Sequence, residues 1–158
     1  AQKAYDQGRC DVFVTDKFGL GARRLAMTNT NDHIILPETI SNEPISPMVP
    51  HGDQVWRDIV VWTLNSLITA EEYGITSKNI DKMRSSSTNP FIQRVLGKTG
   101  KFGGKIGLGK DWAYRAIKAV GNYGEICENH LGKHGLGMPR GKNELYTNGG
   151  LLISPPFR

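Results

Sequence analysis

The sequence contains only two cysteines, Cys10 and Cys127, among its 158 residues. Two cysteines allow one disulfide at most and exclude the framework of a disulfide-rich domain. Cys10 borders a predicted strand and is expected to be a small buried residue. Long apolar stretches are also missing: the most apolar segment, residues 59–70, contains four polar residues. It is too short and too polar to span a bilayer.

The beginning of the chain shows neither a leader nor an initiator Met. No apolar stretch precedes Asp11, so no signal peptide is visible. Residues 1–7 are typical of the last turns of a helix that ends at Gly8. Such a beginning indicates either a mature product or a fragment, and we interpret the chain as a fragment of a longer protein.

Aromatic residues make up only 8% of the sequence, which bears on the meaning of its net charge of +5. A nucleic-acid-binding face usually combines a basic stripe with aromatic side chains for stacking. Here only Phe102 and Trp112 lie near the densest basic cluster. That cluster lies among glycines and consists of Lys98, Lys101, Lys105 and Lys110. This pattern favours a solvated basic loop, so no nucleic-acid partner is expected.

No set of residues typical of catalysis, metal binding or nucleotide binding can be assembled. Residues 104–111 nearly match the Walker A spacing, but Asp111 occupies the position of the Mg²⁺-binding hydroxyl and would repel phosphate. Cys127, His130 and His134 are close in sequence but lack a fourth ligand. No Ser/His/Asp or Cys/His set is evident. We predict no enzyme activity, no catalytic residue, no metal and no cofactor.

The most informative residue is Asp16, which follows a short β-branched and aromatic run, residues 12–15. That run is typical of a buried strand, and residues 17–26 after it are compatible with a helix. In open α/β sheets, ligands bind outside the carboxyl ends of the strands. Asp16 is therefore either a ligand-binding carboxylate or the N-cap of the following helix.

Further elements alternate along the chain. A second strand is predicted at residues 33–36, before Pro37, and an edge strand at 45–49 within a proline-rich extended stretch. Asp53 and Gly74 delimit the clearest helix, whose apolar stripe is expected to be the main contributor to the core. The stripe comprises Trp56, Ile59, Val60, Thr63, Leu64, Leu67 and Ile68. Shorter helices are predicted at 77–83, 90–96 and 142–146, and a long helix at 112–131.

Several separate stretches resemble one family. Residues 8–16 resemble the lobe-closing segment of bacterial amino-acid-binding proteins of ABC importers, and the whole chain resembles their general L-amino-acid-binding subfamily. The other stretches that carry the resemblance are residues 56–64, 111–114, 120–125, 149–151 and 155–156. The resemblance covers nearly all of the chain and implies only the C-terminal half of such a protein.

The resemblance implies an α/β fold, namely a partial periplasmic-binding-protein type II fold with a mainly helical C-terminal extension. Residues 1–36 would be the end of lobe two and 37–41 a hinge strand. Residues 42–75 would be the returning part of lobe one, and 76–158 the helical extension. In the precursor, the resemblance implies a signal peptide, and the mature protein would act in the periplasm.

The resemblance also assigns a ligand. Asp16 would accept hydrogen bonds from the α-ammonium group of an L-amino acid, which the protein would bind by cleft closure and deliver to an inner-membrane ABC permease. The arginine for the ligand's carboxylate would come from the missing N-terminal half, since Arg9, Arg23 and Arg24 do not match it. Without that half, exposed sheet edges favour a homodimer. The alternatives are a truncated or split remnant that only self-associates and, third, a basic nucleic-acid-binding module.

Overall fold

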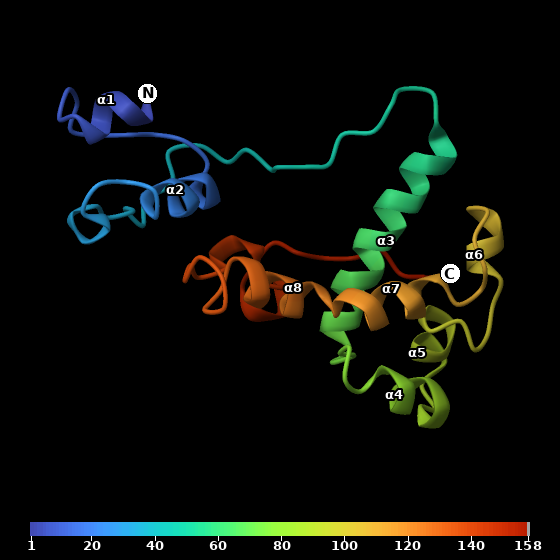
Figure 1. The fold of residues 1–158 in the computed structure, drawn as a ribbon. Helices are drawn as coiled ribbons and strands as arrows, with labels where there is room; N and C mark the ends of the chain where they lie inside the picture. The colour runs from blue at the N-terminus through green and yellow to red at the C-terminus, as the bar shows by residue number, and fades with distance from the viewer. Residues whose placement is uncertain (158) are drawn as a thin grey trace.

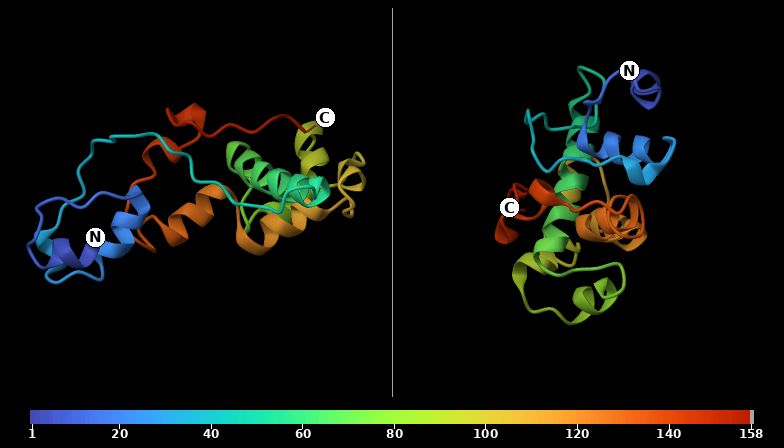
Figure 2. Two further views of the ribbon diagram at one scale, coloured as in Figure 1. Left: turned by 90° about the horizontal axis from the view of Figure 1, so that it is seen from above. Right: turned by 90° about the vertical axis from the view of Figure 1, so that its left-hand side faces the viewer.

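The computed structural model describes residues 1–157. A small N-terminal module (residues 1–36) is joined by an extended segment (37–53) to a helical body (54–157), as Figure 1 shows. The two views in Figure 2 show the module beside the orange part of the body, where α8 lies. No helix among these residues is long and apolar enough to cross a membrane.

Local hydrogen bonds tie the N-terminal module together. It contains α1 (Gln2–Asp6), α2 (Lys17–Arg24) and a 3₁₀ turn, η1 (Thr30–Asp32). The Asp6 carboxylate accepts from the backbone N–H of Thr28 at 3.0 Å and from its hydroxyl at 3.2 Å. The Tyr5 hydroxyl and His33 Nδ1 are 2.9 Å apart. The predicted end of the first helix at Gly8 is confirmed, because Gly8 adopts a φ of +69°.

The predicted strands are wrong for this structure. Residues 12–15, 33–36 and 45–49 pair with no other segment, and no β-ladder forms anywhere in residues 1–157, where Leu145 and Leu152 make one isolated bridge. The physical reason is the lack of a neighbour. Residues 10–15 and 34–52 form no backbone–backbone hydrogen bond within the described chain. A strand needs such a partner to satisfy its ladder.

Helix α3 (Gln54–Glu72) begins and ends as predicted. The Asp53 carboxylate caps it by accepting from the Trp56 N–H at 2.9 Å, and Gly74 follows its end with a φ of +63°. The predicted burial of its whole stripe is wrong: Leu67 and Ile68 are buried, but Trp56 is 49% exposed. The first turn of α3 is exposed, whereas Ile59 and Trp62 pack against the core and the residues from Ser66 to Ala70 are buried in it.

The core lies between α3 and the helices that follow it. These are α4 (Ile80–Ser86), α5 (Pro90–Val95), α6 (Phe102–Lys105), α7 (Trp112–Val120) and α8 (Tyr123–His130), with η2 (Gly141–Asn143) and η3 (Tyr146–Asn148). Phe157 lies at its centre, 5.1 Å from the Trp62 ring and 5.2 Å from that of Phe102. The other buried members are Leu67, Ala70, Ile75, Ile80, Ile92, Val95, Leu96, Ile106, Trp112, Ala113 and Ile117.

The helix predicted over residues 112–131 is broken, which corrects that prediction. Gly121 adopts a φ of +84° and ends α7. Asn122 then begins α8 with a capping box: its side chain accepts from the Glu125 N–H, and the Glu125 carboxylate accepts from the Asn122 N–H. Partial burial alone would raise the pKa of Glu125, but hydrogen bonds from Asn122 and Ser77 hold it below its usual value.

Three further predictions also need correction. The helix predicted at 142–146 is replaced by the 3₁₀ turns η2 and η3. The helix predicted at 77–83 begins three residues later, at Ile80. Cys10 is exposed rather than buried, Cys127 is buried, and both thiols are free.

Replacing Asn122 by Ala should destabilise the chain by about 2 kcal/mol. The change removes the cap of α8 and leaves the Ile75 carbonyl without the side-chain N–H that now reaches it at 2.8 Å. Chemical denaturation measures the loss. The matched control is Asn129→Ala on the exposed face of α8, which should change stability by less than about 0.5 kcal/mol. Equal effects of the two changes would contradict the assigned role of Asn122.

Candidate functional site

Asp16 lies between the extended residues 12–15 and α2, where the sequence places it. It occupies the N-cap position, and its carbonyl accepts from the Leu20 N–H at 2.8 Å. Its carboxylate, however, accepts no hydrogen bond from any residue of the range 1–157 and is exposed. The expectation that its side chain caps the helix is therefore wrong. The carboxylate is available to another partner.

The support beneath Asp16 is packed against the helical body. Gly21, in the middle of α2, lies so close to Met138 that a Cβ there would be 2.1 Å from the Met138 Sδ atom. Glycine at this position lets the flexible Met138 side chain lie directly against α2, next to the helix that follows Asp16. The contact could not be predicted, because a glycine inside a helix does not reveal which residue packs on it.

The arginines of the module do not converge on Asp16. Arg23 donates to the Gln2 side chain at 3.1 Å, and its guanidinium lies 5.9 Å from the centre of the Phe13 ring. The Nε atom of Arg24 is buried and has no hydrogen-bond partner in the described part of the chain. Arg9 lines a surface hollow of about 380 Å³ beside α1, and Asp16 is not part of its lining. The carboxylate of Asp16 therefore stands apart from these cations.

The other sets of reactive residues remain separate. Within residues 1–157, no three His, Cys, Asp or Glu side chains converge in a way that could hold a metal ion. Cys127 is buried in α8, whereas His130 and His134 are exposed. Burial raises the pKa of the Cys127 thiol, so this thiol is protonated at neutral pH. In the glycine-rich stretch, Asp111 pairs with Arg115 at 3.5 Å.

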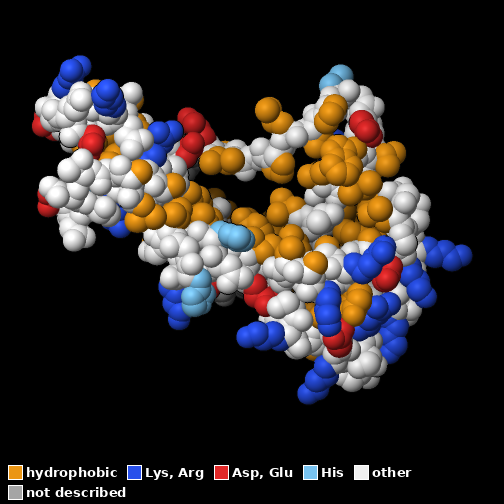
Figure 3. Space-filling model, viewed as in Figure 1, with side chains coloured by type: hydrophobic (Ala, Val, Ile, Leu, Met, Phe, Trp, Pro, Cys, Tyr) orange, Lys and Arg blue, Asp and Glu red, His pale blue; other side chains and the backbone are white. Residues whose placement is uncertain are grey.

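A broad set of apolar side chains is exposed in the N-terminal module, along the extended segment and at the beginning of α3. Exposed and half-buried residues alternate along both runs, 12–15 and 33–36. The apolar surface continues along the extended segment and over the beginning of α3 (Figure 3). Its members, called the apolar surface below, are Val12, Val14, Ile34, Leu36, Ile40, Ile45, Met48, Val55 and Trp56. So many large exposed apolar side chains are typical of a surface that another protein segment covers.

The chain is similar to amino-acid-binding proteins of two bacteria. No protein-family model matches the chain. It is 48% identical over 158 residues to the glutamate/glutamine/aspartate/asparagine-binding protein BztA of Rhodobacter capsulatus, covering 99% of this chain and 47% of BztA. It is 51% identical over 158 residues to the general L-amino acid-binding periplasmic protein AapJ of Rhizobium johnstonii, covering 98% of this chain and 46% of AapJ.

A solved structure agrees with these relatives. The ABC transporter / periplasmic binding protein from Brucella ovis with glutathione bound matches with a TM-score of 0.93 and 48% identity, over 99% of this chain and 50% of that one. The chain thus spans about half the length of the proteins it matches.

Proposed function

We propose that this chain is the C-terminal part of the solute-binding component of an importer for L-amino acids. Nearly the whole chain is homologous to about half of each of the amino-acid-binding and periplasmic binding proteins that it matches. The protein acts in the periplasm, binds its ligand by cleft closure without catalysis, and delivers it to an inner-membrane ABC permease. The observation that carries this proposal is the Asp16 carboxylate, which is exposed and does not cap α2, in a chain with these relatives.

Asp16 binds the α-ammonium group of the ligand in this proposal. An ammonium group buried in a closed cleft needs an ionised hydrogen-bond acceptor, since an unpaired buried charge is very costly. The named ligands of the relatives support this role: the amino acids and glutathione all carry a free α-ammonium and an α-carboxylate. Contacts limited to these shared groups predict broad specificity.

The proposed division of the chain follows the lobes of such a protein. Residues 1–36 complete lobe two, residues 37–41 cross the hinge, and residues 42–75 return to lobe one. Residues 76–158 form a helical C-terminal extension, and of these residue 158 lies outside the residues that the structure describes. The arginine for the ligand's carboxylate comes from the half of the relatives that this chain does not match. The fold is then the α/β type expected from the sequence, with residues 12–15 and 33–36 paired as strands in the complete protein.

The apolar surface supports this completion. Val12 and Val14 on one extended run, and Ile34 and Leu36 on the other, are between 58% and 79% exposed. Exposed and half-buried apolar side chains that alternate along a run are typical of a β-strand whose second face is covered by another part of the protein. We assign the N-terminal half of the same protein as the partner that covers it. Where that half is absent, the same surface favours a homodimer.

Calorimetry with a panel of L-amino acids tests the proposal on two proteins: this chain and the completed chain, in which this chain is joined to the remainder of its protein. One charge-assisted contact contributes at most about 3 kcal/mol, whereas micromolar affinity needs about 8 kcal/mol. The 158-residue chain should therefore bind weakly, and the completed chain with micromolar or better affinity. A completed chain that binds no member of the panel would contradict transport and favour a self-associating remnant.

A further inference from the structure

Positive charge is concentrated in one part of the helical body. Between Lys78 and Lys118 the sequence has ten Lys and Arg residues against two Asp and no Glu, a net charge of +8 that exceeds the +5 of the whole chain. This stretch contains α4 to α6 and most of α7, and Figure 3 shows blue side chains gathered over this part of the body. The proposed amino-acid site uses none of these residues, so the concentration needs a separate explanation.

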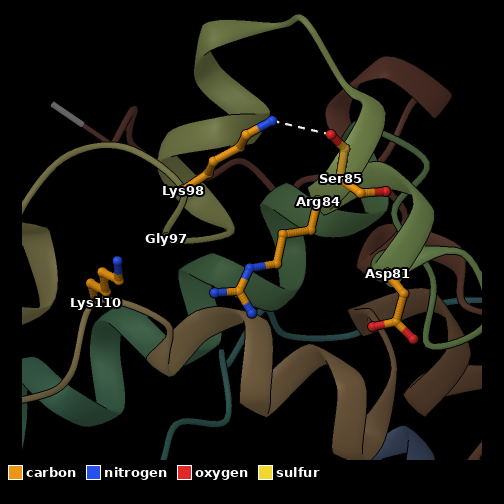
Figure 4. Close-up of a pocket in the computed structure, with 6 residues that line it drawn as sticks. All are labelled: Asp81, Arg84, Ser85, Gly97, Lys98 and Lys110. Carbon is orange, nitrogen blue, oxygen red and sulfur yellow. Dashed lines mark hydrogen bonds between the residues drawn. The ribbon is translucent and has the colours of Figure 1, made fainter.

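A surface hollow lies within this basic part of the chain. Its volume is about 410 Å³, and residues of α4, the turn after α5 and the residue before Asp111 line it (Figure 4). The lining residues are Asp81, Arg84, Ser85, Gly97, Lys98 and Lys110. Three of the six are cations, and one is an acid.

A close approach of two backbone segments places two of the cations, Lys98 and Lys110, at the same hollow. Gly97 has a φ of +70°, and a Cβ on it would lie 2.1 Å from the Lys110 carbonyl oxygen and 2.9 Å from the Asp111 Cα atom. Only glycine permits this close approach of the two backbone segments. Lys98 and Lys110 are twelve residues apart in sequence but are thereby fixed on either side of Gly97, as Figure 4 shows.

The third cation, Arg84, is oriented by an aromatic ring. Its guanidinium carbon lies 4.2 Å from the centre of the Tyr114 ring. In Figure 4 the guanidinium extends into the space between Lys110 and Asp81. Such a cation–π contact leaves the N–H groups of the arginine free to donate. Arg84 is thus held in place without its charge being neutralised.

The acid in the hollow is already paired. Asp81 forms an ion pair with Lys118 and accepts from the Tyr114 hydroxyl at 2.7 Å. These bonds, that with Lys118 above all, hold the pKa of Asp81 below its usual value. In contrast, no carboxylate of residues 1–157 pairs with Arg84, Lys98 or Lys110. Lys98 donates to the Ser85 carbonyl at 3.1 Å. The hollow therefore has an excess of two to three positive charges.

We propose that this hollow binds a phosphate-type oxyanion, held by Lys98, Lys110 and the N–H groups of Arg84. A tetrahedral oxyanion offers several acceptors to donors on different sides, which suits two lysines and a planar guanidinium. A nucleotide base has no stacking partner here, because none of the six residues that line the hollow is aromatic. The phosphate group comes either from a free phosphate compound or from a phospholipid headgroup.

Isothermal titration calorimetry of the 158-residue chain with inorganic phosphate at low ionic strength tests the site. The double variant Lys98→Gln/Lys110→Gln should bind phosphate at least about tenfold more weakly than the parent chain. The control, Lys101→Gln/Lys105→Gln, removes the same charge from exposed positions outside the hollow and should stay within about twofold. The proposal is overturned if the parent does not bind phosphate or if the two double variants lose affinity equally.

A second arm identifies the source of the phosphate. Co-sedimentation with phosphatidylglycerol vesicles, using phosphatidylcholine vesicles for comparison, measures lipid binding. Binding to phosphatidylglycerol that millimolar phosphate displaces assigns a lipid headgroup, whereas phosphate binding without vesicle binding assigns a free phosphate compound. An oligonucleotide that binds more tightly than phosphate and is not displaced by it would overturn the proposal in favour of a nucleic-acid surface. The phosphate titration and the vesicle measurement both use the 158-residue chain, so their results do not depend on whether the completed chain binds amino acids.

Discussion

Replacing Arg140 by Met should lower the free energy of unfolding by about 3 to 5 kcal/mol. Arg140 and Glu71 have side chains only 14% and 13% exposed, and Arg140 donates to both carboxylate oxygens of Glu71, at 2.5 and 3.0 Å. It also donates to the Asn143 carbonyl at 2.8 Å. The variant leaves the Glu71 charge buried without a partner. That penalty is a large part of the 5 to 15 kcal/mol that stabilises a typical domain.

The electrostatics of the pair explain why it persists despite burial. Burial alone would lower the pKa of Arg140, but the hydrogen bonds and charge of Glu71 and the charge of Glu144 raise it above its ordinary value. Glu144 lies 3.4 Å from Arg140. Because Arg140 contacts both Glu71 at the end of α3 and Asn143 in η2, it connects these two segments. The pair joins the C-terminal segment to the core, as do the bonds from Tyr146 to Glu72 and from Arg94 to the Phe157 carbonyl.

Three comparisons make the prediction for Arg140 specific. Arg115→Met breaks an exposed pair with Asp111 and should cost less than about 1 kcal/mol. The double variant Arg140→Met/Glu71→Met should recover most of the loss, because no uncompensated charge remains. Arg140→Lys should be intermediate, since lysine cannot bond a carboxylate with a planar fork. Urea denaturation measures all of them, and a loss below about 1 kcal/mol for Arg140→Met would contradict the account.

Asp16→Ala in the completed chain should weaken the binding of L-amino acids by about 3 kcal/mol, which is more than a hundredfold. In the proposed closed cleft, the change leaves the ligand's ammonium group buried without an acceptor. Folding should be unaffected, since the carboxylate is exposed and accepts no hydrogen bond from residues 1–157. Calorimetry with one amino acid that the completed chain binds measures the loss.

The matched control for Asp16 is Asp11→Ala. Asp11 is also an exposed aspartate of the N-terminal module, five residues earlier, so its removal changes the net charge equally. The affinity of this control should stay within about twofold of the parent. A loss of affinity common to both variants would indicate a general effect of charge rather than a contact with the ligand.

Features set by neighbouring residues could be predicted from the sequence. The start of α3 follows from Asp53 and its end from Gly74, because capping and left-handed backbone depend on one or two residues. The position of Asp16 after an extended run was predictable for the same reason. Asn122 carries a local signal as well: with Glu125 three residues later, it has the spacing of a capping box. That signal predicts the break in the helix at 112–131.

Features set by distant residues could not be predicted. Residues 12–15 have the composition of a strand, yet a strand exists only where another segment pairs with it, and no described segment does. The apolar stripe of α3 predicts burial but does not show that the beginning of the helix, around Trp56, lacks a cover. The pairing of Glu71 with Arg140 spans 69 residues. The approach of Gly97 to Lys110, which builds the basic hollow, has no signature in either segment.

The central claim is that Asp16 binds the ammonium group of an amino-acid ligand, and one double-mutant cycle tests it most directly. Calorimetry compares an L-amino acid with its des-amino analogue, on the completed chain and on its Asp16→Ala variant. We expect that removing the ammonium group weakens binding to the parent about a hundredfold or more and to the variant less than about threefold. Equal losses on both proteins would contradict the assignment of Asp16.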